Sequence, residues 1–179
     1  MAFLKSHRGA VLLSVLLVIL SILFGFRRSV TAARAQVEAL FYDGGSGYSI
    51  QAGLDERCAV ARNLLTVASR YLSGEDTADV SAAVRMLEQA DDPAEKYEWN
   101  QALGWAAEEL LATLEDCDLT ERDAAYVQGF RADLTGLANT IRRDSYNQQA
   151  GQFNREVLGA FPANLLKHIT FVREVPLFR

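Results

Sequence analysis

Apolar residues recur three or four positions apart along most of the chain, which is the spacing of one face of an α-helix. No strand-like alternation of useful length is present in the sequence. The sequence therefore predicts an all-α fold. We expect residues 1–28 to form a tail and an N-terminal transmembrane helix, and residues 29–179 to form a helical bundle domain with a C-terminal tail.

The run from Gly9 to Phe26 contains 18 residues and no charge. As a helix it spans about 27 Å, close to the roughly 30 Å of hydrocarbon in a bilayer. A cleaved signal peptide is the alternative, because the A-x-A-like segment TAARA precedes Gln36. The length of the run and the adjacent Arg27 and Arg28 favour an uncleaved, single-pass anchor in the cell membrane. Basic residues on its two sides, Lys5 among them, are nearly balanced and leave the orientation open.

The clearest amphipathic pattern lies between Leu54 and Leu72. Its apolar residues form two adjoining stripes about 100° apart, so this helix should contact two neighbours, as in a bundle. We expect Ser73-Gly74 to end it. Arg57 falls between the stripes, where a guanidinium needs a carboxylate, backbone carbonyls or water. A structural ion pair is the first expectation for Arg57; a contact with a ligand anion and extension into solvent are the alternatives.

Turn and cap residues divide the rest of the chain. The helical spacing of the anchor continues to about Asp43, where GGSG interrupts it. A short helix with Val80, Ala83, Val84 and Leu87 inward follows, and the next begins at Pro93 with Asp92 as its N-cap. That helix should bury Trp99, Leu103, Ala106, Leu110 and Leu114. Trp105 lies about 150° from this stripe, so it is either covered by the tail or a loop, or exposed as a contact point.

The last helix is predicted from Glu121, after a Thr120 cap, to about Ala160. Its first half presents Phe130, Leu134, Leu137 and Ile141 on one face, and its second half presents Tyr146, Ala150, Phe153 and Val157. The second stripe is rotated about 160° from the first. The helix therefore either meets different neighbours at its two ends or bends near residues 142–145.

An aromatic-asparagine pair occurs twice in this region, seven residues apart. We interpret Tyr146 and Phe153 as core anchors one heptad apart, and Asn147 and Asn154 as flanking residues that can hydrogen-bond across the seam. The Phe-Pro pair that follows should stop the helix at Pro162. Packing and termination explain most of this motif.

Charge and composition exclude several function classes. The net charge is −5, and the first 28 residues contain four bases and no acid, so the remainder carries 14 bases and 23 acids. Such an acidic domain is a poor nucleic-acid binder. Nucleotide-binding, hydrolase and metal motifs are absent, and Cys58 lies on an inner stripe, where burial makes a thiol inert. The sequence predicts no enzyme, no cofactor and no metal site.

Three segments resemble the LemA family: RRDSYNQQAGQFNREVLGAFPANLLKHITF (142–171), LDERCAVARNLLTVASRYL (54–72) and DDPAEKYEWNQAL (91–103). The resemblance extends over roughly residues 30–178, and it implies a membrane-tethered antiparallel helical bundle. Two departures are the insertion YDGGSGYSIQAG after the anchor and Arg62 in place of the family's usual proline before Asn63. The resemblance implies little about activity and carries over no catalytic residues.

Two function classes remain. A scaffold or protein-interaction module, acting through a protein partner or self-association, is the first expectation. The alternative is a sensing or signalling module that binds a small molecule between helices. A large pocket lined by Arg57, Asn147 and Asn154 would favour sensing, and a flat exposed apolar face would favour the scaffold. The apolar tail from Leu165 to Phe178 should fold back on the bundle or lie at the membrane surface.

Overall fold

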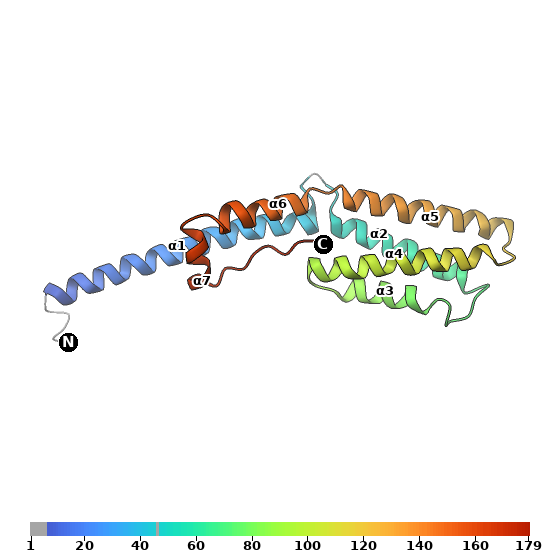
Figure 1. Ribbon diagram of the computed structural model, residues 1–179, viewed down its shortest axis with the longest axis horizontal. Helices are drawn as coiled ribbons and strands as arrows, with labels where there is room; N and C mark the ends of the chain where they lie inside the picture. The colour runs from blue at the N-terminus through green and yellow to red at the C-terminus, as the bar shows by residue number, and fades with distance from the viewer. Residues whose placement is uncertain (1–6, 46) are drawn as a thin grey trace. The chain divides into compact units, whose positions relative to one another are not determined.

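A computed structural model of the chain describes residues 7–45 and 47–179 (Figure 1). All the regular elements in these residues are helices, which confirms the all-α prediction. Lys5 lies outside the described residues. The structure contains two compact units that are described separately: an anchor unit of residues 7–38 and 149–175, and a bundle unit of residues 39–148 and 176–179. The predicted domain division at residue 28 stays a prediction.

Helix α1 extends from His7 to Asp43. It is long and apolar enough to cross a membrane, and most side chains of its apolar run are exposed. The helix ends where the glycine-rich segment predicts. Gly44 has a φ of +67°, and a Cβ there would lie 2.3 Å from the Tyr48 carbonyl oxygen, so only glycine fits this turn without strain.

Four complete helices lie in sequence among the described residues of the bundle unit: α2 (Ile50–Ala68), α3 (Ala78–Gln89), α4 (Pro93–Glu115) and α5 (Glu121–Arg142). Helix α2 packs against α5 and α3, and α3 packs against α4 (Figure 1). The expected N-caps are confirmed. The Asp92 side chain accepts from the Ala94 N–H, and the Thr120 side chain accepts from the Asp123 N–H. These caps satisfy backbone donors that the first helical turn leaves free.

Two predictions in the bundle unit are wrong in detail. Helix α2 ends at Ala68 rather than near Ser73, because residues 69–72 form a tight turn in which the Tyr71 N–H donates to the Ala68 carbonyl. On α4, the predicted burial of Leu103, Leu110 and Leu114 is confirmed, but the buried face is turned toward Asn100, Ala107 and Leu111. Trp99 and Ala106 are consequently only half-buried.

The predicted last helix is interrupted, and the alternative of a bend near residues 142–145 is confirmed. Helix α5 ends at Arg142, and α6 begins at Tyr146 and ends at Gln152. A π-helical segment, η2, covers Phe153–Leu158. A π-turn contains more residues than an α-turn, so the buried position moves from the predicted Val157, which is exposed, to Leu158, which is fully buried.

The anchor unit contains η2 and α7 (Ala163–Thr170) beside the middle of α1 (Figure 1). The predicted termination before Pro162 is confirmed, because the helix ends at Leu158 and a cis Phe161-Pro162 bond precedes α7. The tail is partly buried. Val175 is buried in the anchor unit and Phe178 in the bundle unit. The predicted folding back of the tail on the bundle is therefore confirmed for Phe178.

Candidate functional site

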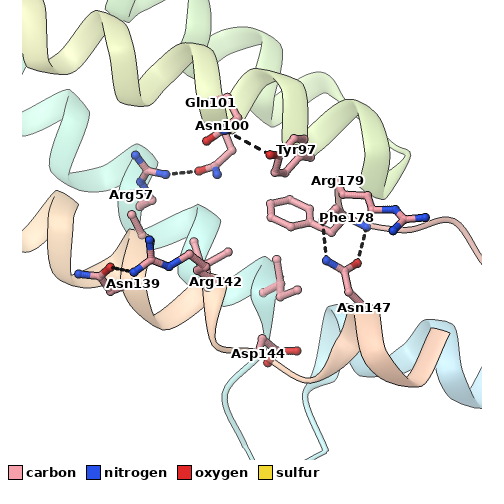
Figure 2. A pocket seen from close by; sticks show the side chains of 13 residues that line it. Arg57, Tyr97, Asn100, Gln101, Asn139, Arg142, Asp144, Asn147, Phe178 and Arg179 are labelled. Carbon is pink, nitrogen blue, oxygen red and sulfur yellow. Dashed lines mark hydrogen bonds between the residues drawn. The ribbon is translucent and has the colours of Figure 1, made fainter. Parts of the chain in front are cut away.

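A cavity of about 420 Å³ opens at one end of the bundle unit, where α5 stops and α6 starts (Figure 2). Its walls come from α2, α4, the end of α5, the first turn of α6 and the C-terminal residues. The lining residues are Ile50, Arg57, Tyr97, Asn100, Gln101, Ala138, Asn139, Ile141, Arg142, Asp144, Asn147, Phe178 and Arg179. The cavity lies at the break between α5 and α6. Residues 143–145 interrupt the helix there, so the end of α5 and the first turn of α6 form two separate walls.

Arg57 is the most unusual residue of the cavity. Only 4% of it is exposed, and its guanidinium donates through Nη1 to the Asn100 side-chain oxygen. Among the described residues no carboxylate lies within ion-pair distance of Arg57, and its Nε has no hydrogen-bond acceptor. Burial lowers the pKa of the guanidinium from its ordinary value. The first expectation, a structural ion pair, is therefore wrong, because the polar partner is a neutral amide.

The other charges of the cavity are unevenly distributed. Arg142 lies at the C-terminal end of α5 and donates to the Asn139 side-chain oxygen at 2.8 Å. Asp144 supplies a carboxylate, but one of its oxygens accepts the Tyr146 N–H at 2.7 Å and so begins α6. The lining thus contains three arginines, Arg57, Arg142 and Arg179, and one acidic side chain, Asp144, which already accepts a hydrogen bond. An anion would find an excess of hydrogen-bond donors here.

Asn147 and Asn154 fix the C-terminal tail in a way that the sequence did not predict. The Asn147 side chain donates to the Phe178 carbonyl at 2.7 Å and accepts from the Phe178 N–H at 2.8 Å (Figure 2). In the anchor unit, Asn154 makes the same pair of bonds with Val175, at 2.9 and 2.8 Å. Each side-chain amide thus satisfies both the N–H and the C=O of one extended tail residue, as a neighbouring β-strand would do. Only Asn147 lines the cavity.

The aromatic partners of the motif are buried, as predicted. Tyr146 is fully buried, its ring contacts Phe41, and its hydroxyl donates to the Pro176 carbonyl at 2.6 Å. Phe178 closes the cavity with its ring 5.3 Å from Tyr97, in an edge-to-face arrangement. Phe153 is buried in the anchor unit. The motif therefore combines two core anchors with two backbone-binding amides.

Trp105 lies outside the cavity on α4, and 74% of it is exposed. The described structure therefore matches the contact-point alternative rather than cover by the tail or a loop. Its neighbours on the helix surface, Gln101, Glu108 and Glu109, are exposed as well, so Trp105 is a single apolar residue on an acidic surface.

The state of Cys58 and the distribution of metal-ligating side chains complete the description of the site. Burial raises the pKa of the Cys58 thiol to about 11, so this thiol is neutral at physiological pH. No group of three His, Cys, Asp or Glu side chains in the described part of the chain could hold a metal ion. The cavity instead presents hydrogen-bond donors around a buried positive charge, an arrangement that suits binding.

Sequence reasoning missed most of the cavity. Asn100 lies in line with Leu103 and Ala107, so a polar residue within the buried stripe was the available signal. Arg142 and Asp144 were named only as the region of a possible bend. Phe178 was recognised as part of an apolar tail, but nothing in its spacing indicated which helix it would reach.

Comparison with known proteins agrees with this architecture. The model of the LemA family matches residues 47–179, which include all the helices of the bundle unit from α2 onward and the whole C-terminal motif. No curated protein and no solved structure matches the chain significantly. Because the matched segment is well over half of the sequence, the chain belongs to the LemA family.

Proposed function

We propose that this LemA-family protein is a membrane-anchored module that binds a small anionic molecule between α2, α4 and α5. The observation that carries the proposal is the buried guanidinium of Arg57, which has no carboxylate partner among the described residues. Removing a charge from water without a counter-charge costs several kcal/mol. A bound anion would offset that cost, and the free Nε of Arg57 is a donor that such an anion could use.

The lining residues indicate the chemical class of the ligand. A carboxylate or phosphate group pairs well with a guanidinium, because its oxygens match the planar fork of N–H donors. Arg57 and Arg142 supply such forks, while Gln101 and Tyr97 offer further polar groups. The cavity volume of about 420 Å³ lies in the range of small-molecule sites. The proposal assigns binding and no catalytic step to this site.

This order of candidates reverses the expectation from sequence. A pocket lined by Arg57 and both asparagines was the expected sign of sensing, and the cavity contains Arg57 and one of the two, Asn147. A flat apolar face was the expected sign of a scaffold, and the surface around Trp105 is mostly polar. The lining of the cavity and the polar surface around Trp105 both favour ligand binding over a scaffold role.

Thermal melting of the full chain in detergent micelles tests the proposal, with inorganic phosphate and citrate as probes. A ligand at a hundred times its Kd stabilises the folded state by about 2.7 kcal/mol, so the melting temperature should rise and saturate with concentration. Arg57→Met should abolish that rise. The stability of the unliganded protein should change little, because the removal of a buried unpaired charge is offset by the loss of the donor to the buried Asn100 oxygen.

Arg62→Met is the matched control. Arg62 lies on the same helix, but it is exposed and paired with Glu88. Its replacement should leave the ligand-induced rise unchanged. A rise that fails to saturate, or one that persists in Arg57→Met, would show that the probes act on the surface or the solvent rather than in the cavity.

A second candidate function, interaction with a protein partner or self-association, is favoured by the exposure of Trp105. Exposed tryptophans on rigid helices are typical interface hot spots. Under this proposal Trp105→Ala eliminates crosslinked complexes in the membrane while the melting curve barely moves, since the side chain buries little in the free protein. Complexes that survive the substitution would exclude Trp105 as the contact.

The proposal also places the protein in the cell membrane through residues 9–26 of α1. The observation that supports it is the length and apolar character of this helix. The full chain should remain with membranes through high salt and alkali. Recovery of a soluble species that begins at Gln36 would instead indicate a cleaved signal peptide.

A further inference from the structure

The anchor unit contains a groove of about 330 Å³ that neither the cavity nor Trp105 explains. Its walls are one side of α1 and the residues that follow α7, and it is lined by Arg27, Thr31, Arg34, Phe171, Val172 and Arg173. All six residues belong to the anchor unit. We propose that this groove binds the headgroup of an anionic phospholipid, with α7 lying at the membrane surface. The inference rests on the proposal that α1 spans a bilayer.

The charge of the groove suits a phosphate. Arg27 and Arg173 are exposed, and the side chain of neither makes a hydrogen bond or ion pair with another described residue. Arg34 is already paired with Glu38 at 2.9 Å, and its Nε donates to the Glu174 carbonyl. Among the described residues that line the groove none is acidic. Two free guanidiniums therefore remain for an anion.

The position of the groove along α1 matches the headgroup layer. The uncharged run ends at Phe26 and Arg27 is the next residue, so Arg27 would lie where hydrocarbon gives way to phosphates. Thr31 and Arg34 follow one and two turns later, so the groove extends along about 10 Å of helix. One headgroup region is about 5–8 Å thick, so the groove would extend through that region and slightly beyond it.

Exposed apolar side chains beside the groove indicate a lipid surface rather than water. Leu165 and Ile169 lie four residues apart on the same face of α7, and both are exposed. Phe161 before the helix and Phe171 after it are still more exposed, Phe171 at 83%. Apolar residues flanked by basic ones are the pattern of a segment that lies in the membrane interface. The bilayer entered by α1 would supply the apolar medium that these four side chains lack.

Native mass spectrometry of the full chain, released from detergent micelles with phosphatidylglycerol or phosphatidylcholine added, tests the site. The protein should retain phosphatidylglycerol preferentially. Each basic residue near an anionic membrane surface contributes about 1 kcal/mol, or roughly fivefold. Arg27→Gln with Arg173→Gln should therefore weaken retention about 25-fold, without loss of helix content, because neither arginine has a recorded partner in the structure.

Arg155→Gln is the control, since Arg155 is an exposed arginine of the same unit outside the groove. Equal retention by the control and the double variant would overturn the proposal, because it would indicate general attraction to positive charge. Equal retention of the two lipids by the unaltered chain would overturn it as well.

Amide hydrogen exchange in nanodiscs that hold one copy tests the position of α7. The amides of residues 163–171 should be protected in nanodiscs with phosphatidylglycerol, and Leu165→Gln with Ile169→Gln should remove that protection. Protection that arises only when two copies share a nanodisc would overturn the proposal in favour of self-association. Alkaline extraction of the same variants reports on α1 alone, so failure of the anchor is distinguishable from failure of the lipid site.

Discussion

Replacement of Asn147 by aspartate should make docking of the tail residue Phe178 depend on pH. The asparagine amide donates to the Phe178 carbonyl and accepts from the Phe178 N–H, at 2.7 and 2.8 Å. An ionised aspartate can accept from the N–H but has no proton to donate, so the carbonyl loses its partner and faces a negative oxygen. A protonated carboxyl group has both a donor and an acceptor, as the amide does.

The magnitude follows from one lost hydrogen bond and one unpaired carbonyl. A net bond contributes about 1 kcal/mol and an unsatisfied buried group costs about 1–3 kcal/mol. We therefore expect the Asn147→Asp change to weaken tail docking by about 2–4 kcal/mol at neutral pH, which is roughly 30- to 900-fold in the opening equilibrium. The adjacent carbonyl should raise the pKa of the new carboxyl above its ordinary value of about 3.9. Docking should then be restored as the pH falls through that raised pKa.

Hydrogen exchange of the C-terminal amides in the full chain measures this opening, expressed at each pH as a ratio to the unaltered protein. Local opening of the tail is the relevant event, because its residues can detach without unfolding the helices. Asn147→Ala should raise exchange equally at every pH, and Asn63→Ala, at an exposed position of α2, should leave it unchanged. A ratio for Asn147→Asp that stays constant between about pH 7 and pH 4 would refute the reciprocal hydrogen bonding.

Two further predictions concern packing. Phe153→Ala should destabilise the protein by about 3–5 kcal/mol in urea melts, because a buried aromatic ring is lost; unchanged stability would remove the core-anchor interpretation. Gly53→Ala should also destabilise it, by about 1–3 kcal/mol, because the added Cβ would lie 2.8 Å from Cγ1 of Ile141. Gly129→Ala, where the space is open, should instead add up to about 1 kcal/mol of stability through helix propensity, and equal effects at the two glycines would contradict the proposed crowding.

Local chemistry explains which parts of the fold were predictable. A cap or a helix break depends on a few neighbouring residues, so Asp92, Thr120 and the glycines after Asp43 could be recognised from the sequence. The break near residues 142–145 was also visible, because a helix cannot keep two stripes about 160° apart against one neighbour. These features needed no knowledge of the other helices.

Features that depend on contacts between distant segments could not be predicted in the same way. The buried face of α4 includes Asn100, whose side-chain oxygen accepts from Arg57 of α2, and no spacing within α4 indicates that contact. The π-helical segment η2 moves the buried position from Val157 to Leu158. Arg57 and Asn147 could be identified because each belongs to a local sequence pattern. The other residues of the cavity are brought together by contacts between distant segments, which no local pattern shows.

Acid should weaken the contact between the turn after α2 and the start of α5. The Asp123 carboxylate accepts the Tyr71 hydroxyl at 2.6 Å and Arg70 Nη1 at 2.7 Å, although Asp123 itself is buried. The Tyr71 hydrogen bond, followed by those from Arg70, lowers the pKa of Asp123 below its ordinary value. A lowered folded-state pKa means that the stabilisation is fully present above the unfolded value of about 3.9 and is lost as the pH falls through the folded value.

Melting curves of the full chain across the acid range, compared with those of Asp123→Asn, isolate this contribution. The difference in melting temperature between the two proteins should be constant near neutral pH and should shrink below about pH 4. Protonation then removes the carboxylate charge of Asp123 from the unaltered protein, and Asp123→Asn already lacks that charge. Asp133→Asn, at an exposed position of the same helix, controls for the loss of one negative charge and should not reproduce the trend. A difference that persists undiminished in strong acid would mean that the carboxylate's charge does not stabilise this contact, and that the Tyr71 and Arg70 bonds contribute only through geometry that asparagine preserves.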